Sequence, residues 1–302
     1  MQLTQFLLVA GAIGASAHPS AHGHLHRAVH AKRDAPVFLK PVEPTPTPVA
    51  SPELEPTPSA PSIKSPPKPK QSEEPKPDPG SGSGSHIPFC TEGGGPASKA
   101  KRVTMEQILY TGNLGTANGC QWNSNLMLVP ASIKDQYKYV QEYHNVADEP
   151  YEVMCANKMG ADGKNTGSFK VPGQNPLIFT VAPGEKKYVA ADKNTQGICA
   201  FAPNSIPTTT HGQYAGVWAE FDFENASNEG WSGADCSSLV AQAYDMDVPG
   251  CRMSHGGVDS DILPGGIGKN AYTKGMEALD GIGLNIPAGS VVIEVKLGFN
   301  GN

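Results

Sequence analysis

Prolines are distributed very unevenly along this chain, and their distribution divides it into two parts. Of the 28 prolines, 15 lie between Pro36 and Pro79. This stretch has few aromatic or β-branched residues, so burial of apolar surface cannot offset the entropy lost on ordering it. We therefore predict that residues 34–87 form a disordered, partly polyproline II-like arm, which ends in the flexible run Gly80–Ser85.

The remaining residues, 88–302, are predicted to form one globular domain of ordinary size with a sizeable core. From Cys90 onward the chain has 15 Lys and Arg against 22 Asp and Glu, a net charge of −7. A mildly acidic domain without basic clusters is a poor match to nucleic acid or to an anionic membrane. Neither is expected as a partner.

The first 17 residues are typical of an export signal. A short polar start leads into the apolar run Phe6–Ala15, and Ala15 and Ala17 supply small residues at positions −3 and −1 of a cleavage site. Residues 18–33 then contain five histidines and end in the dibasic pair Lys32-Arg33. We predict cleavage after Ala17, removal of this propeptide, and a secreted protein that begins at Asp34. A metal-binding or pH-sensing role for the histidines is the alternative to a discarded propeptide.

The predicted domain contains six cysteines, at positions 90, 120, 155, 199, 236 and 251. An even number in an exported domain predicts three disulfides and no free thiol. No Cys-x-x-Cys occurs, which argues against a zinc site, and no cofactor is expected. Six cysteines allow 15 pairings, and their spacing does not choose among them.

Short apolar or alternating runs separated by Gly, Pro, Asn and Asp predict an all-β domain, an antiparallel sandwich. The expected strands are residues 125–129, 137–144, 151–157, 176–181, 187–191, 198–202, 217–223 and 290–297. Helical patterns are few: one over residues 132–139, which conflicts with a strand, and a weak one over 270–279. The glycine-rich stretch 254–268 is expected to be a surface loop.

The most patterned segment is Trp218–Glu224. On a strand, Phe221 and Phe223 face one side, while Trp218, Glu220, Asp222 and Glu224 face the other. Such a face predicts either an acidic groove for general acid–base chemistry on a sugar or a solvated outer surface of the sheet. With Asp235, two of these residues, Glu220 and Asp222, are the catalytic candidates if the protein is an enzyme. Both are expected to be open to solvent beside Glu224, which favours binding over catalysis.

Trp231, in a glycine-rich loop before Cys236, suits either stacking on a sugar ring or packing against a disulfide. Trp122, beside Cys120, has the same two interpretations, and Trp218 is the third candidate glycan contact. Asn225-Ala-Ser227 is a glycosylation sequon in a predicted loop.

Specific catalytic and metal motifs do not occur. Gly-x-Ser-x-Gly is absent, and a triad built from Ser237 or Ser238 with His211 or His255 would rest on scattered residues. Asp162–Asn165 lacks the later glutamate of a calcium loop, and Asp259 and Asp261 suit a solvated loop better than a calcium site.

Several segments together resemble the fungal secreted allergen family typified by the Aspergillus allergen Asp f four. They are residues 110–115 (YTGNLG), 157–163 (NKMGADG), 184–190 (GEKKYVA), 194–197 (NTQG), 218–223 (WAEFDF) and 230–233 (GWSG). Their order and spacing carry the resemblance, over about Cys90 to His255. It implies an extracellular fungal protein that human IgE binds, and it implies no reaction.

The family typically has aromatic residues near the positions of Cys155 and Cys199, so two cysteines that depart together suit a mutual bridge. A second resemblance is to thaumatin-like proteins, in which a β-sandwich carries an acidic cleft. Glu220–Phe223 and the segment after Asp235 take those parts here. The resulting hypothesis is a secreted, cell-wall-associated protein with affinity for wall glycan. The alternative is a glycan-active hydrolase of thaumatin-like type.

Overall fold

The computed structural model describes residues 85–90 and 112–302 of the chain. The predicted signal peptide, propeptide and proline-rich arm, with Ala17, Lys32 and Arg33, lie outside the described residues, apart from the last few positions of the arm. Within the described part, no helix is both long and apolar enough to cross a membrane.

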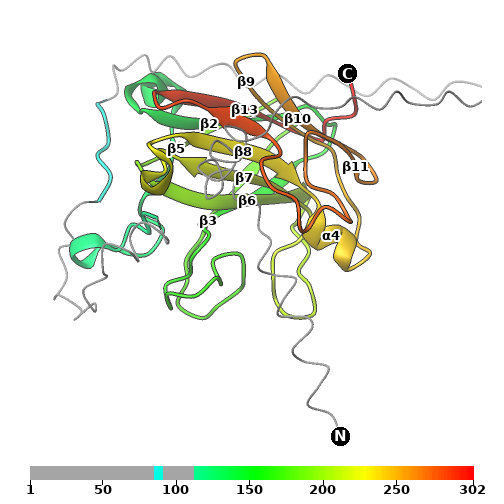
Figure 1. The fold of residues 1–302 in the computed structure, drawn as a ribbon, viewed down its shortest axis with the longest axis horizontal. Coiled ribbons are helices and arrows are strands. Elements are labelled where there is room, and N and C mark those ends of the chain that lie inside the picture. The colour runs from blue at the N-terminus through cyan, green and yellow to red at the C-terminus, as the bar shows by residue number, and fades with distance from the viewer. Residues whose placement is uncertain (1–84, 91–111) are drawn as a thin grey trace, which may run out of the picture. The chain divides into compact units, whose positions relative to one another are not determined.

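The domain is a sandwich of two β-sheets (Figure 1). The seven-stranded sheet has the order β1-β5-β2-β13-β9-β10-β11, and the six-stranded sheet has the order β12-β8-β7-β6-β3-β4. The strands are β1 (Leu126–Val129), β2 (Tyr139–Asn145), β3 (Tyr151–Asn157), β4 (Leu177–Val181), β5 (Lys186–Ala191), β6 (Thr195–Pro203), β7 (Val217–Phe223), β8 (Ser232–Ser237), β9 (Cys251–His255), β10 (Val258–Leu263), β11 (Ile267–Lys269), β12 (Leu284–Ile286) and β13 (Val291–Leu297).

The all-β prediction is confirmed, and all eight expected strands form within a few residues of their predicted ends. Pairing is antiparallel except between β2 and β13, which run parallel with Tyr139 opposite Val291. The helical elements are short: η2 (Ala117–Gly119), η3 (Ala131–Gln136), η4 (Ala226–Asn228) and α4 (Leu239–Ala243).

Two local predictions are wrong. Residues 254–268, expected to be a loop, contain β10 and most of β11, because their glycines form the turns of a meander (Gly256, Gly257, Gly265 and Gly266 all have positive φ). Residues 270–279, a weak helical pattern, form a loop instead.

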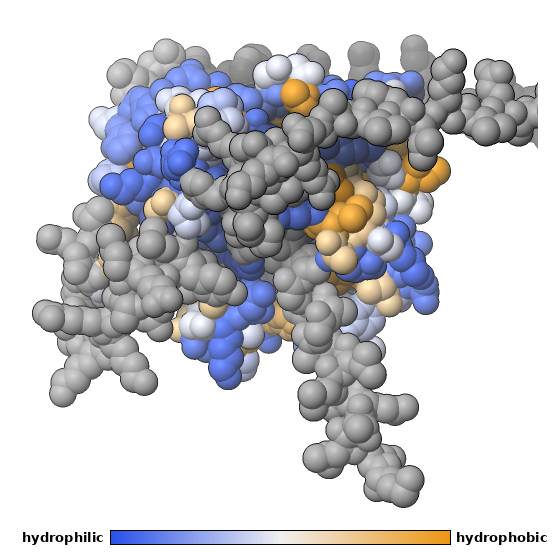
Figure 2. Space-filling model, in the orientation of Figure 1, coloured by the Kyte–Doolittle hydropathy of each residue, from blue (hydrophilic) through white to orange (hydrophobic). Residues whose placement is uncertain are grey.

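Alternating side chains of both sheets fill the space between them. Val291, Ile293, Val295 and Leu297 of β13 are all fully buried there, opposite strands β3, β6 and β7. Two of the large buried side chains, Tyr139 and Phe223, pack with ring centroids 5.3 Å apart and join the sheets near one end. On the face seen in Figure 2, hydrophilic side chains predominate and apolar ones gather in smaller groups.

A second apolar cluster covers the outer face of the six-stranded sheet. It contains Met154, Ala156, Ile198, Ala200 and Trp218 from the strands, and Trp122, Ile206 and Tyr214 from loops. The loop residues are fixed by side-chain contacts, so this face of the sheet is buried and not solvated. In Figure 1 the loops after β3 and after β6 extend away from the seven-stranded sheet.

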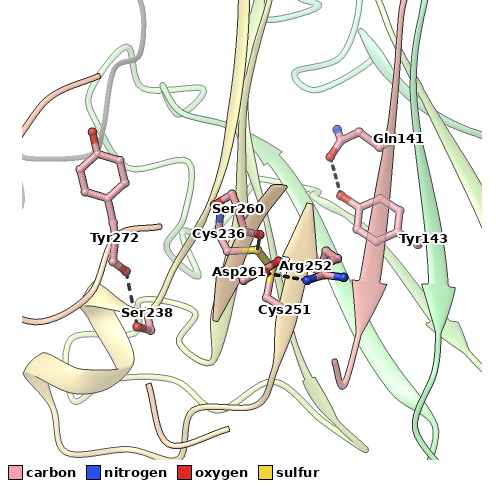
Figure 3. Close-up of a disulfide and its surroundings, with 9 residues drawn as sticks. All are labelled: Gln141, Tyr143, Cys236, Ser238, Cys251, Arg252, Ser260, Asp261 and Tyr272. Atoms are coloured by element: carbon pink, nitrogen blue, oxygen red, sulfur yellow. Dashed lines mark hydrogen bonds and ion pairs between the residues drawn. A yellow bond between two sulfur atoms is a disulfide. The ribbon is translucent and has the colours of Figure 1, made fainter. Parts of the chain in front are cut away.

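Three disulfides cross-link the domain. Cys90–Cys120 ties the segment before the sandwich, and Cys155–Cys199 joins residues that are directly opposite on β3 and β6. Cys236–Cys251 connects β8 to β9, and therefore one sheet to the other (Figure 3). The prediction of three bridges, with Cys155–Cys199 as the first pairing, is confirmed, and the described cysteines include no free thiol.

We expect thiol titration of the denatured, non-reduced protein to find no free thiol, whereas two or more would contradict the three bridges.

The double variant Cys155→Ala/Cys199→Ala should be destabilised by about 2–4 kcal/mol, because a 44-residue loop then stays open in the unfolded chain. Urea unfolding measures this. An unchanged midpoint would show that the bridge does not stabilise the sandwich.

Candidate functional site

The candidate carboxylates are buried, and the prediction that they are open to solvent is wrong. Along β7 the alternation is as expected, with Phe221 and Phe223 in the core between the sheets. Glu220 and Asp222 lie on the opposite face, yet only 5% and 2% of each residue is exposed. Both are buried because loops cover this face of the six-stranded sheet, and no local sequence pattern predicts such a cover.

Asp235 lies directly opposite Glu220, because β7 and β8 pair in that register. Side chains of directly opposite residues point to the same face, with Cβ atoms about 5 Å apart. Asp235 is completely buried, and neither of its carboxyl oxygens has a hydrogen-bond partner among the described residues. Glu220 is better satisfied, since the hydroxyl of Ser237 bonds to its carboxyl group. The two carboxyls thus form a close, dry pair.

Burial sets the protonation of this pair. Desolvation raises the pKa of Glu220 to about 7, against the opposing effects of Ser237 and Lys158. Burial, reinforced by the charge of Glu220, raises the pKa of Asp235 well above its ordinary value. Two neighbouring buried carboxyls cannot both ionise cheaply, so the pair retains at least one proton in acid. Burial also lowers the pKa of Lys158 to about 8, although Glu220 and Asp222 favour its charged form.

Asp222 is held by the sequon asparagine. The Asn225 Nδ2 donates a hydrogen bond of 2.6 Å to Asp222 Oδ2, and Asn225 Oδ1 accepts bonds from Ser227 N and Oγ. Asn225 is only 1% exposed and caps η4. The nitrogen that would carry a glycan is therefore engaged inside the fold, and this placement disfavours glycosylation of the folded domain.

Glu224 departs from the predicted face. Its φ of 47° lies in the left-handed region, which breaks the strand alternation at the end of β7. Its carboxylate turns toward the other sheet, where it accepts hydrogen bonds from the Tyr139 hydroxyl and from Lys138 Nζ (2.8 Å for the latter). Glu224 therefore belongs to a separate polar cluster with Lys138 and Tyr139, and not to the Glu220–Asp235 pair.

The three tryptophans have different environments. Trp122 and Trp218 are 8% and 6% exposed, and their indole N–H groups donate to the carbonyls of Met159 and Tyr214. Both are packing residues of the loop-covered face and are not available for stacking on a sugar. Trp231 is 39% exposed and lies at the end of the β7–β8 hairpin loop, directly before β8.

The remaining candidates do not assemble into a site. Cys236 is disulfide-bonded, and His255 Nδ1 is paired with the Val292 carbonyl at 2.8 Å. Asp261 forms a bidentate ion pair with Arg252, drawn in Figure 3, and is not a calcium ligand in this arrangement. Across the described residues no three His, Cys, Asp or Glu side chains are placed to hold a metal ion.

Comparison with known proteins gives the family. Residues 124–297 match the family described as the Allergen Asp f 4-like domain, over more than half of the chain. The chain belongs to the Asp f 4-like allergen family. It is 33% identical over 215 residues to the Aspergillus fumigatus protein named Allergen Asp f 4. That match covers 70% of this chain and 64% of the relative, so the chain spans less than two thirds of the relative's length.

Solved structures offer more distant similarities. The protein elicitor MoHrip2 from Magnaporthe oryzae has a TM-score of 0.33 at 13% identity, covering 53% of this chain and 99% of the other. The thaumatin-like xylanase inhibitor TLXI has a TM-score of 0.31 at 10% identity, covering 52% and 97%. At these scores neither similarity indicates a function for this chain.

The Asp f 4-like region begins just before β1 and ends with β13, so it includes both sheets, the carboxyl pair and Trp231. Cys90–Cys120 lies outside it. Sequence analysis missed Lys158 and Tyr272 as neighbours of the carboxyl pair, because each lies in a loop far along the chain. Lys158 lies within the segment NKMGADG, residues 157–163, which contributed to the family resemblance but did not indicate a chemical role for the lysine.

The Glu220→Gln variant tests the raised carboxyl pKa. The ordinary value is 4.5 and the folded value about 7, so the stability that this proton contributes is fully present below pH 4.5. This contribution to the free energy of unfolding, about 2–3 kcal/mol, is lost as the pH rises through about 7. In urea unfolding from pH 4.5 to 7.5, the wild type should lose stability over this range, and Glu220→Gln should lose less, because only the raised pKa of Asp235 then contributes.

Glu142→Gln is the matched control, because Glu142 pairs with Lys186 on the outer face of the other sheet. It should keep the wild-type pH dependence. Equal slopes for wild type and Glu220→Gln would mean that Glu220 titrates normally in the folded protein.

Proposed function

We propose that this protein is a secreted, non-enzymatic component of the fungal cell surface that binds wall glycan through its β7–β8 hairpin. The observation that carries the proposal is the exposure of Trp231 on an otherwise well-fixed loop. Its backbone N–H donates to the Asn228 carbonyl, and its carbonyl accepts from Asn225 N, both at 2.9 Å. An exposed aromatic ring on a rigid backbone can stack on a sugar with little loss of conformational entropy.

Polar groups suited to sugar hydroxyls lie near the backbone of this hairpin loop. A Cβ built on Gly230, the residue before Trp231, would be 3.8 Å from Glu224 Cγ. Glu224 pairs with Lys138, and their side chains are 30% and 50% exposed, so both are open to a ligand. An exposed aromatic residue in the same hairpin as a charge-balanced carboxylate and ammonium suits a neutral polysaccharide better than a polyanion.

The predicted export signal, the three disulfides and the family support an extracellular location. The relative named Allergen Asp f 4 supports a further proposal, that IgE of sensitised hosts binds this chain. The proline-rich arm suits a tether through a wall matrix.

Retention on insoluble β-glucan and chitin tests the binding proposal. The wild type should co-sediment with at least one of them, and Trp231→Ala should bind about tenfold more weakly, which corresponds to about 1.4 kcal/mol. Ile178→Ala is the matched control, because Ile178 is 49% exposed on β4, the opposite edge of the same sheet. No retention of the wild type, or equal retention of the Trp231→Ala variant, would refute this site.

A glycan-active hydrolase remains the second candidate, favoured by the raised pKa of Glu220, a property of general acids. Against it, Glu220, Asp222 and Asp235 are each at most 5% exposed, so a polysaccharide has no direct approach to them in this conformation. We expect no reducing sugar to be released from soluble glucan. Release that is abolished by Glu220→Gln but not by Glu142→Gln would establish the hydrolase instead.

A further inference from the structure

A loop crosses the edge of β8 next to the carboxyl pair. We call this segment, Tyr272–Gly283, the strap. At its start, Tyr272 N donates to the Cys236 carbonyl and Ser238 N donates to the Tyr272 carbonyl, both at 2.9 Å. At its end, Asn270 holds Gly283 through two hydrogen bonds of 3.0 and 3.1 Å. The strap is therefore fixed at both ends and has no regular structure between them.

The strap packs closely on the residue that carries the unpartnered carboxyl. A Cβ built on Gly283 would be 2.7 Å from Asp235 Cβ and 2.5 Å from the Ala234 carbonyl oxygen. Tyr272 is 1% exposed, and its hydroxyl accepts a weak 3.4 Å bond from Ile282 N. The side chain of Tyr272 interacts electrostatically with Asp235, Asp280 and Glu220, so it lies among these acids. Asp235 is thus enclosed by β7 on one side and by the strap on the other.

The surroundings favour a protonated pair. Among the described residues, Lys158 after β3 interacts electrostatically with Glu220 and Asp222, and Tyr272 of the strap interacts with Glu220, Asp235 and Asp280. This group of side chains contains one cation and four carboxyl groups. Asp235 has no donor among the described residues to receive a negative charge. An ionised, unpartnered carboxylate in a dry site is costly, and it is stabilised most directly by water.

We propose that the strap is a pH-sensitive cover of the carboxyl pair: it is closed on β8 while both carboxyls are protonated, and it opens to admit water when the pair loses its first proton. The strap is the part able to move. β8 is paired with β7 along its length and bound to β9 by Cys236–Cys251. Within the strap, Gly275 and Gly281 have positive φ, and a Cβ at either would meet no atom within 4 Å. The raised pKa of Glu220, about 7, places the change near neutral pH.

Hydrogen–deuterium exchange of the full-length protein tests this proposal. Exchange is measured at pH 5 and pH 8.5 and corrected for the intrinsic effect of pH on amide exchange. Peptides covering Tyr272–Leu284 should exchange at least tenfold faster at pH 8.5 in the wild type. Glu220→Gln removes the carboxyl whose pKa, about 7, lies between these two pH values, so its strap should stay protected. Glu142→Gln should behave as the wild type.

Two results would overturn the proposal: corrected exchange of the strap that is the same at both pH values, or faster exchange spread equally over all strands. If Glu220→Gln does not fold, the wild type alone decides, because its strap should still exchange faster at pH 8.5 than at pH 5. The proposal does not rest on glycan binding, and its outcome is independent of retention on β-glucan or chitin.

Discussion

The outer face of the six-stranded sheet is covered by loops, and this cover determines whether the candidate residues on that face can meet a ligand or must stay buried. Trp122, which precedes β1, and Ile206 and Tyr214, both in the connection from β6 to β7, pack over β3, β6 and β7. A sheet in a sandwich commonly has one solvated face, and here that face is dry. Burial removes Trp122 and Trp218 from any ligand surface and makes Glu220 and Asp235 hold protons that they would otherwise lose well below neutral pH.

Much of the fold was predictable, because eight strands have the apolar or alternating pattern of half-buried β-structure. One strand that was not predicted, β8, lacks this pattern. β8 reads Ser-Gly-Ala-Asp-Cys-Ser, and every one of its residues is buried. Its burial comes from β7, β12 and the strap, not from its own hydrophobicity. β10 and β11 were not predicted because the glycines beside them are as typical of a long loop as of the tight turns of a β-meander, which they form here.

The site was predictable in its composition but not in its environment. Period-two alternation placed Glu220 and Asp222 on one face correctly, but sequence alone cannot say what covers that face. The same alternation failed for Glu224, whose left-handed backbone turns its carboxylate to Lys138 and Tyr139. Lys158 and Tyr272 approach the carboxyl pair from distant loops, a juxtaposition that only the tertiary structure creates.

A dry carboxyl pair lowers stability whenever it must ionise, and a pair of apolar residues in register would pack there at no such cost. The domain tolerates the pair because other constraints are strong: two disulfides act on the strands that surround it, Cys155–Cys199 through β6 and Cys236–Cys251 through β8. Each contributes about 2–4 kcal/mol, comparable to the ionisation cost of the pair. The covalent bridge of β8 to the other sheet also means that relaxation around Asp235 falls on the strap. Stability and local mobility therefore belong to different parts of the same edge of the sheet. The Cys236–Cys251 disulfide holds β8 in place, and the strap that covers β8 moves when the carboxyl pair changes its protonation.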